Sequence, residues 1–117
     1  MLRTAYNRVK SVRIDTSSSN VPTTYGSGST SLKITGVSGQ GYSHLRIGNE
    51  TTARIAITTT HSDAGVPSSD PVANSEQMYC CSTSTEFRDD LSLFDYVYIR
   101  SDSGSAISTG IITIEVW

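Results

Sequence analysis

Residues 96–117 read YVYIRSDSGSAISTGIITIEVW, and they hold two runs in which apolar and polar side chains alternate. In the second run Ile112, Ile114 and Val116 alternate with Thr113, Glu115 and Trp117. A period of two places the apolar side chains on one face of an extended strand, whereas a helix would repeat them every three or four residues. The stretch therefore predicts strands at residues 95–100 and 111–117. A turn at residues 101–104, with Gly104 at a position that needs a positive φ, would make them a hairpin.

The same alternation recurs upstream in five short runs, at residues 9–14, 31–35, 43–47, 53–59 and 77–81. Clusters of Gly, Ser, Asn, Asp and Pro separate these runs, and we expect Gly48 and Asn49 to form the tight turn between two of the strands. About seven strands with one apolar face each predict an all-β fold. We expect a compact antiparallel β-sandwich, jelly-roll or immunoglobulin-like, without a long helix and with a single domain over residues 1–117.

One short segment carries a helical signal instead. Residues 83–86 read TSTE, which fits a capping box, and Phe87 and Leu91 follow four residues apart. This pattern predicts one helical turn within residues 83–93.

The composition favours a small β-domain over a disordered chain. The 117 residues include 20 Ser and 15 Thr, and also six Tyr, one Trp and clustered Ile and Val, which disordered chains lack. The net charge of −2 gives no overall positive field to attract nucleic acid. The N-terminal residues are locally basic, however, and residues 1–10 are interpreted as a basic arm that docks onto a partner.

Cys80 and Cys81 are the only cysteines, and adjacent cysteines rarely pair because a normal disulfide needs a larger Cα separation than one peptide gives. We expect two thiols on alternate faces of a strand. The sequence has no apolar signal region and no run of transmembrane length, so we expect synthesis in a cytoplasm and no membrane partner.

The sequence does not indicate an enzyme. The only histidines are His44 and His61, and no serine lies in a nucleophile-elbow motif. The spacing of Cys and His does not fit zinc, and the glycine-rich stretches lack a phosphate-binding pattern, so no cofactor or metal is expected. A loop-bound calcium ion is an alternative that the acids leave open, namely Asp63, Asp70, Glu76, Asp89 and Asp90.

Two groups of residues are candidates for partner contact. Tyr96 and Tyr98 alternate with Val97 and Ile99, so they would face outward if the aliphatic side chains face the core. Outward aromatic side chains often mark a protein contact. Together with the basic arm, the candidate contact residues are Leu2, Arg3, Tyr6, Arg8, Lys10, Tyr96 and Tyr98.

Two parts of the sequence resemble small β-sandwich structural proteins of tailed bacteriophage virions. The resembling parts are residues 45–57, LRIGNE running into IAI, and residues 97–117, which read VYIRSDSG, then STG, then IEVW. The resemblance implies a non-enzymatic virion protein, namely a capsid decoration or cement protein that binds the major capsid protein or other virion proteins. A homotrimer seated between capsid subunits is favoured. The alternatives are a tail or baseplate module, a carbohydrate-binding module and, last, a hydrolase built on one of the histidines.

Overall fold

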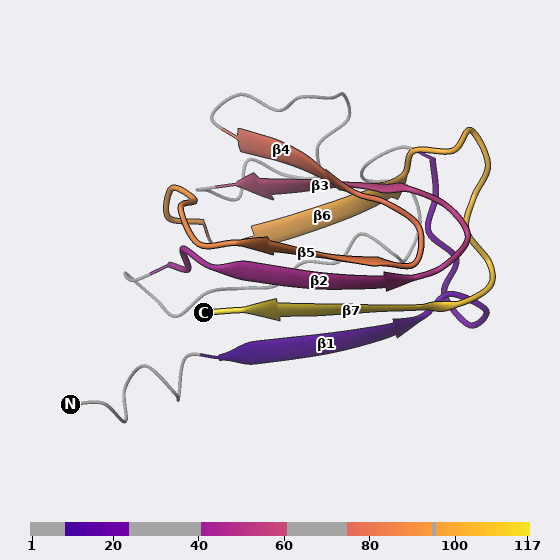
Figure 1. Cartoon of the computed structure of the whole chain (residues 1–117), viewed down its shortest axis with the longest axis horizontal. Helices are drawn as coiled ribbons and strands as arrows, with labels where there is room; N and C mark the ends of the chain where they lie inside the picture. Colours follow the sequence, from indigo (N-terminus) through magenta and orange to yellow (C-terminus); the bar gives the residue numbers. More distant parts are fainter. Residues whose placement is uncertain (1–8, 24–40, 61–74, 95) are drawn as a thin grey trace.

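A computed structural model describes residues 9–23, 41–60, 75–94 and 96–117. These residues form seven strands and no helix (Figure 1). The described part of the chain therefore contains no helix that could cross a membrane. The strands are β1 (Lys10–Asp15), β2 (Leu45–Glu50), β3 (Ile55–Thr60), β4 (Ser75–Cys80), β5 (Ser84–Arg88), β6 (Tyr96–Ser101) and β7 (Ile111–Val116).

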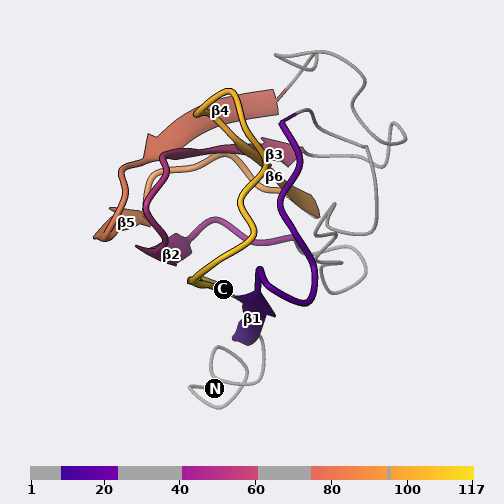
Figure 2. The ribbon, with the colours of Figure 1, turned by 90° about the vertical axis from the view of Figure 1, so that its right-hand side faces the viewer.

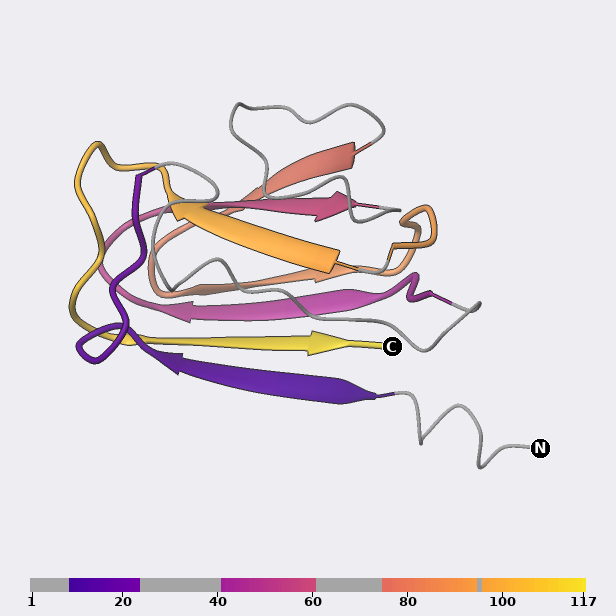
Figure 3. The ribbon, with the colours of Figure 1, turned by 180° about the vertical axis from the view of Figure 1, so that it is seen from behind.

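The strands make two antiparallel sheets that face one another, as the alternating pattern predicts. One sheet has the order β1-β7-β2-β5 and the other the order β4-β3-β6. Figure 2, which looks along the strands, shows the two layers, and Figure 3 shows the three-stranded sheet from its own side. The side chains between the layers form one core, whose fully buried members include Leu45, Ile47, Ile55, Ile57, Ile99, Ile112 and Ile114. The all-β sandwich is therefore confirmed.

The strand pairs are nested along the chain. β3 pairs with β4, β2 with β5, and β1 with β7, so each pair encloses the previous one in sequence. This nesting is the jelly-roll arrangement, in which a long hairpin wraps around the core. An immunoglobulin-like sandwich would instead pair its first strand with its second. The strand order thus selects the first of the two topologies that the sequence left open.

The C-terminal hairpin predicted from the sequence is wrong. β6 pairs with β3, whereas β7 lies in the other sheet between β1 and β2, so residues 102–110 cross from one sheet to the other. Gly104 does adopt a positive φ of 85°, as the turn pattern required. Gly110, at φ 101°, approaches β2 so closely that a Cβ there would lie 2.6 Å from the carbonyl oxygen of Glu50. The glycines therefore shape a crossover and not a hairpin.

The predicted helical turn at residues 83–93 is also wrong. Residues Ser84–Arg88 form β5 at the edge of the four-stranded sheet, where Phe87 lies opposite Arg46 of β2. The capping-box pattern predicted that a helix starts at Thr83. Thr83 instead has a positive φ of 53° and precedes the strand. Pairing with β2 therefore overrides the local helical signal. The strand expected at residues 31–35 lies outside the described residues.

The turn expected at Gly48 and Asn49 forms three residues later, at Thr51–Ala53. Asn49 stays in β2 with its side chain buried between the sheets, where Nδ2 donates to the carbonyl oxygens of Ala53 (2.8 Å) and Cys81 (3.1 Å). Cys80, the last residue of β4, is buried and Cys81 is exposed, so one thiol faces in and one faces out as expected, although Cys81 lies just after the strand. Burial raises the pKa of the Cys80 thiol.

Candidate functional site

The outer face of the four-stranded sheet carries a patterned set of side chains. We use the term outer face for the residues that point away from the core on this sheet: Ser11, Arg13, Asp15, Arg46, Gly48, Glu50, Thr85, Phe87, Ile111, Thr113 and Glu115. The strand register aligns them in rows across the sheet. One row holds Ser11, Glu115, Arg46 and Phe87, and the next holds Arg13, Thr113, Gly48 and Thr85.

An aromatic cluster of His44, Phe87 and Trp117 lies at one end of the outer face. The His44 and Trp117 rings are stacked at a centroid distance of 5.3 Å, and Phe87 lies 5.9 Å from Trp117 at an angle of 42°. The backbones of His44 and Trp117 exchange two hydrogen bonds, of 3.0 and 3.2 Å, which extend the β2–β7 ladder. Phe87 is 52% exposed. The cluster is therefore an aromatic surface in contact with solvent.

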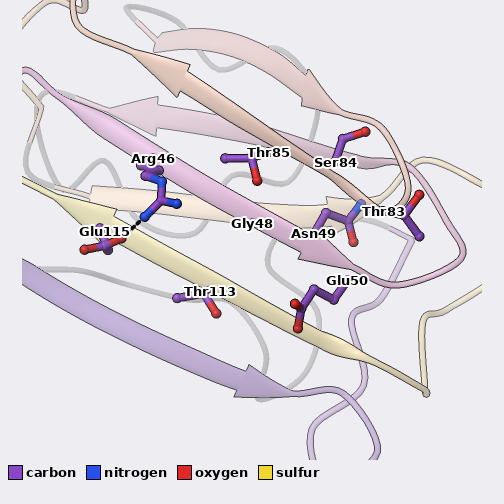
Figure 4. Close-up of a pocket in the computed structure, with 9 residues that line it drawn as sticks. All are labelled: Arg46, Gly48, Asn49, Glu50, Thr83, Ser84, Thr85, Thr113 and Glu115. Atoms are coloured by element: carbon purple, nitrogen blue, oxygen red, sulfur yellow. Dashed lines mark hydrogen bonds and ion pairs between the residues drawn. The ribbon is translucent and has the colours of Figure 1, made fainter.

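A hollow of about 550 Å³ lies over β2, β5 and β7 (Figure 4). One of its lining residues, Arg46, pairs across the sheet with Phe87 of the aromatic cluster. Arg46 and Glu115 lie at one end of it, Glu50 and Thr83 lie toward the other, and Gly48 is between them. The remaining lining residues are Asn49, Ser84, Thr85 and Thr113. Hydroxyl, carboxylate and guanidinium groups thus surround an open floor.

Gly48 makes that floor because it has no side chain. It lies in β2, one of the two inner strands of the sheet, and a Cβ built on it would meet nothing within 4 Å. Its φ is not among the positive values found in the described chain. Neither the backbone conformation nor a neighbouring atom therefore requires glycine at this position.

The hollow contains one exposed ion pair and a second acid. Arg46 Nη1 lies 2.9 Å from Glu115 Oε1 in the adjacent strand, and the side chains are 56% and 32% exposed. Such an exposed pair contributes little to stability, so its groups can exchange partners at low cost. Glu50 adds a further carboxylate, so the lining has one guanidinium and two carboxylates.

The structure does not gather the partner-contact residues predicted from the sequence. Leu2, Arg3, Tyr6 and Arg8 lie outside the described residues, and Lys10 is exposed at the start of the edge strand β1. Tyr96 and Tyr98 do lie on the opposite side of β6 from Val97 and Ile99.

The expectation that both tyrosines are exposed is wrong, however. Tyr98 is only 2% exposed and Tyr96 is partly buried, because both pack with Ala56 in a second, smaller apolar cluster. Strand alternation fixes the side of the sheet to which a side chain points, but not whether that side is covered.

The candidates for chemistry are also dispersed. His44 Nδ1 lies 2.9 Å from the hydroxyl of Ser43, and its ring is stacked on Trp117, so its described contacts are those of the aromatic cluster. His61, Asp63 and Asp70 lie outside the described residues. Among the residues whose placement is described, no three His, Cys, Asp or Glu side chains gather in a way that could hold a metal ion.

The sequence analysis did not predict the outer face as a site, although the alternating pattern of residues 44–50 indicates part of it. His44, Arg46, Gly48 and Glu50 alternate with Leu45, Ile47 and Asn49, so their common face follows from the period of two. That these residues lie beside Glu115 and Trp117 depends on the pairing of β2 with β7, which the alternating pattern does not indicate. Phe87 could not be found because its strand was taken for a helical turn.

Comparison with known proteins finds no match to this chain among protein-family models, curated proteins or solved structures.

Proposed function

We propose that this chain is a non-enzymatic binding domain that works through the outer face of its four-stranded sheet. The observation that carries the proposal is the aromatic cluster beside the polar hollow. Aromatic side chains are enriched at binding surfaces, above all where several of them gather. Here the backbone hydrogen bonds between His44 and Trp117 hold the two strands in register and the two rings stack on one another, so the aromatic surface is already assembled before a partner binds.

We further propose that the domain is part of a virus particle, as a capsid decoration or cement protein. Two things support this setting: the resemblance of residues 45–57 and 97–117 to bacteriophage structural proteins, and the jelly-roll arrangement. Jelly rolls occur in viral capsid and lectin domains, which is an analogy at the level of fold and not of site. In this proposal the basic residues from Arg3 to Lys10 attach the domain to the major capsid protein, and the protein is a homotrimer.

The experiment that tests this setting is quantitative mass spectrometry of purified particles whose genome encodes the chain. We expect its peptides in a fixed ratio to those of the major capsid protein. Absence of the chain from the particles would contradict the proposal. A ratio of only a few copies per particle would favour a tail or baseplate module over a decoration protein. The mass of the purified protein in solution tests the trimer.

A further inference from the structure

We propose that the outer face binds a neutral oligosaccharide, which stacks on the aromatic cluster and hydrogen-bonds in the hollow. This inference rests on the proposed function, since it assumes that the domain binds through this face. It adds the chemical class of the ligand and a role for each part of the site.

The aromatic cluster suits the apolar side of a sugar. A pyranose ring presents C–H groups on one face and hydroxyl groups around its edge, so it can lose water from the C–H face without burying a polar group. Phe87 is half exposed and Trp117 is partly buried, with its ring stacked on that of His44, which leaves ring surface open to solvent. The cluster is therefore a stacking surface and not part of the core.

The hollow suits the hydroxyl groups. Arg46 supplies donors, Glu50 and Glu115 supply acceptors, and the hydroxyls of Thr85 and Thr113 do both. The Thr83 hydroxyl donates to the carbonyl oxygen of Ser82 and can accept. Hydrogen bonds from sugar hydroxyls to ionised groups are stronger than those between neutral groups. Because the Arg46–Glu115 pair is exposed, it can open toward a ligand with little loss of stability.

Gly48 is an independent observation that points to a ligand. Glycine within a strand is less favourable than alanine, and it often marks a place where another molecule approaches the backbone. A Cβ built at Gly48 would meet no atom within 4 Å, and no positive φ calls for glycine. We infer that the space is kept open for something outside the chain.

The charges and dimensions narrow the class of ligand. Two carboxylates against one guanidinium disfavour phosphate-rich and uronic acid polymers. The core of a protein interface is depleted of charged residues, whereas three of the side chains around the hollow are charged. From Trp117 to the row of Thr113 and Gly48 the β7 strand spans about 13 Å, which suits a short oligosaccharide better than a single sugar.

The test uses the intrinsic fluorescence of Trp117, which is the chain's one tryptophan and therefore reports only this site. The full chain is titrated with cellohexaose, maltohexaose, mannohexaose and chitohexaose, and with oligogalacturonate as the acidic probe. We expect at least one neutral hexasaccharide to change the fluorescence in a saturable manner and the acidic probe to have no effect. No response to any neutral probe, or a response to oligogalacturonate alone, would overturn the inference.

Three variants identify the surface that binds. Phe87→Ala should weaken binding by about tenfold, because it removes one stacking ring. Tyr79→Ala removes an aromatic side chain of similar exposure from the other sheet and should leave the affinity unchanged. Gly48→Val should abolish binding in a folded protein, because its side chain fills the floor of the hollow. Equal affinities for all three variants would overturn the assigned site.

Failure of this inference can be distinguished from failure of the proposed setting. Particles that contain the chain, combined with no response to neutral saccharides, would remove the ligand class and leave the virion proposal standing. Saccharide binding by a chain that is absent from particles would remove the virion proposal and leave the ligand class standing.

Discussion

Asn49 and Thr51 are joined by two hydrogen bonds at the start of the β2–β3 turn: Asn49 Oδ1 accepts from the backbone N–H of Thr51 at 3.0 Å and from its hydroxyl at 2.6 Å. On its other side, Asn49 Nδ2 donates to the carbonyl oxygens of Ala53 and Cys81. The β2–β3 turn and the β4–β5 connection both pass from one sheet to the other. One buried side chain therefore ties together two crossings at the same end of the sandwich.

Asn49→Ala is expected to lower the free energy of unfolding by about 3 kcal/mol, because it leaves buried backbone groups without partners. Asn49→Asp should be at least as damaging, since a carboxylate cannot donate to the carbonyl oxygens of Ala53 and Cys81. Urea unfolding followed by circular dichroism measures both. Asn20→Ala, at an exposed position, is the control and should change stability little. Equal stability of Asn49→Ala and Asn20→Ala would contradict this role.

Gly110→Ala and Gly48→Ala form a matched pair with opposite expected results. At Gly110 an added Cβ would lie 2.6 Å from a backbone oxygen and φ is 101°, so alanine should cost about 2 kcal/mol or more. At Gly48 the Cβ meets nothing within 4 Å, so alanine should leave stability unchanged or raise it. Thermal unfolding of the two variants checks this. A larger loss at Gly48 than at Gly110 would contradict the close approach of Gly110 to β2.

The two thiols should differ in reactivity. Burial raises the pKa of Cys80, which keeps its thiol protonated and unreactive, whereas Cys81 is exposed. We expect the native protein to react with Ellman's reagent at Cys81 only, and the urea-unfolded protein to react at both. Cys81→Ser should remove the fast reaction. Rapid modification of Cys80 in the folded Cys81→Ser variant would show that β4 is not packed as described.

Asp102 should contribute to stability against acid. Hydrogen bonds from Arg54 and, at 3.0 Å, from Arg100 hold the pKa of this carboxyl below its usual 3.8, with Arg54 the larger cause. A lowered folded-state pKa means that the contribution is present above the unfolded-state pKa and is lost as the pH falls below it.

The measurement is urea unfolding of the wild type and of Asp102→Asn as a function of pH. The stability difference between them should be constant near neutral pH and should shrink as the pH falls below 3.8. A difference that grows on acidification would contradict the assigned cause. Asp15, whose pKa is lowered by hydrogen bonds from Ser17, serves as a second test through Asp15→Asn.

The sequence predicts individual strands well where the apolar period is two. Ile112, Ile114 and Val116 lie in the core as expected, and so do Leu45 and Ile47. The pattern does not determine which strands pair, because any two amphipathic strands can share a sheet. The strands β6 and β7 follow one another along the chain, yet they lie in different sheets, because β7 pairs with β1 and β2.

The candidate site depends on which strands pair, and the alternating pattern does not determine this. Arg46 and Glu115 are 69 positions apart and meet only because β2 pairs with β7 in one register. The alternation places each of them on a solvent-facing side, but only the pairing places them side by side. Tyr98 shows the converse: the alternation gave its side of the strand correctly, while its burial depends on packing that no local pattern records.

The central claim is that the outer face of the four-stranded sheet is the working surface. Its most direct test is a map of backbone amide chemical shifts while the protein is saturated with the neutral hexasaccharide that most changes Trp117 fluorescence. The account predicts the largest shifts at Arg46, Gly48, Thr85, Phe87 and Glu115, with none of similar size on β3, β4 or β6. Shifts centred on the three-stranded sheet would contradict it.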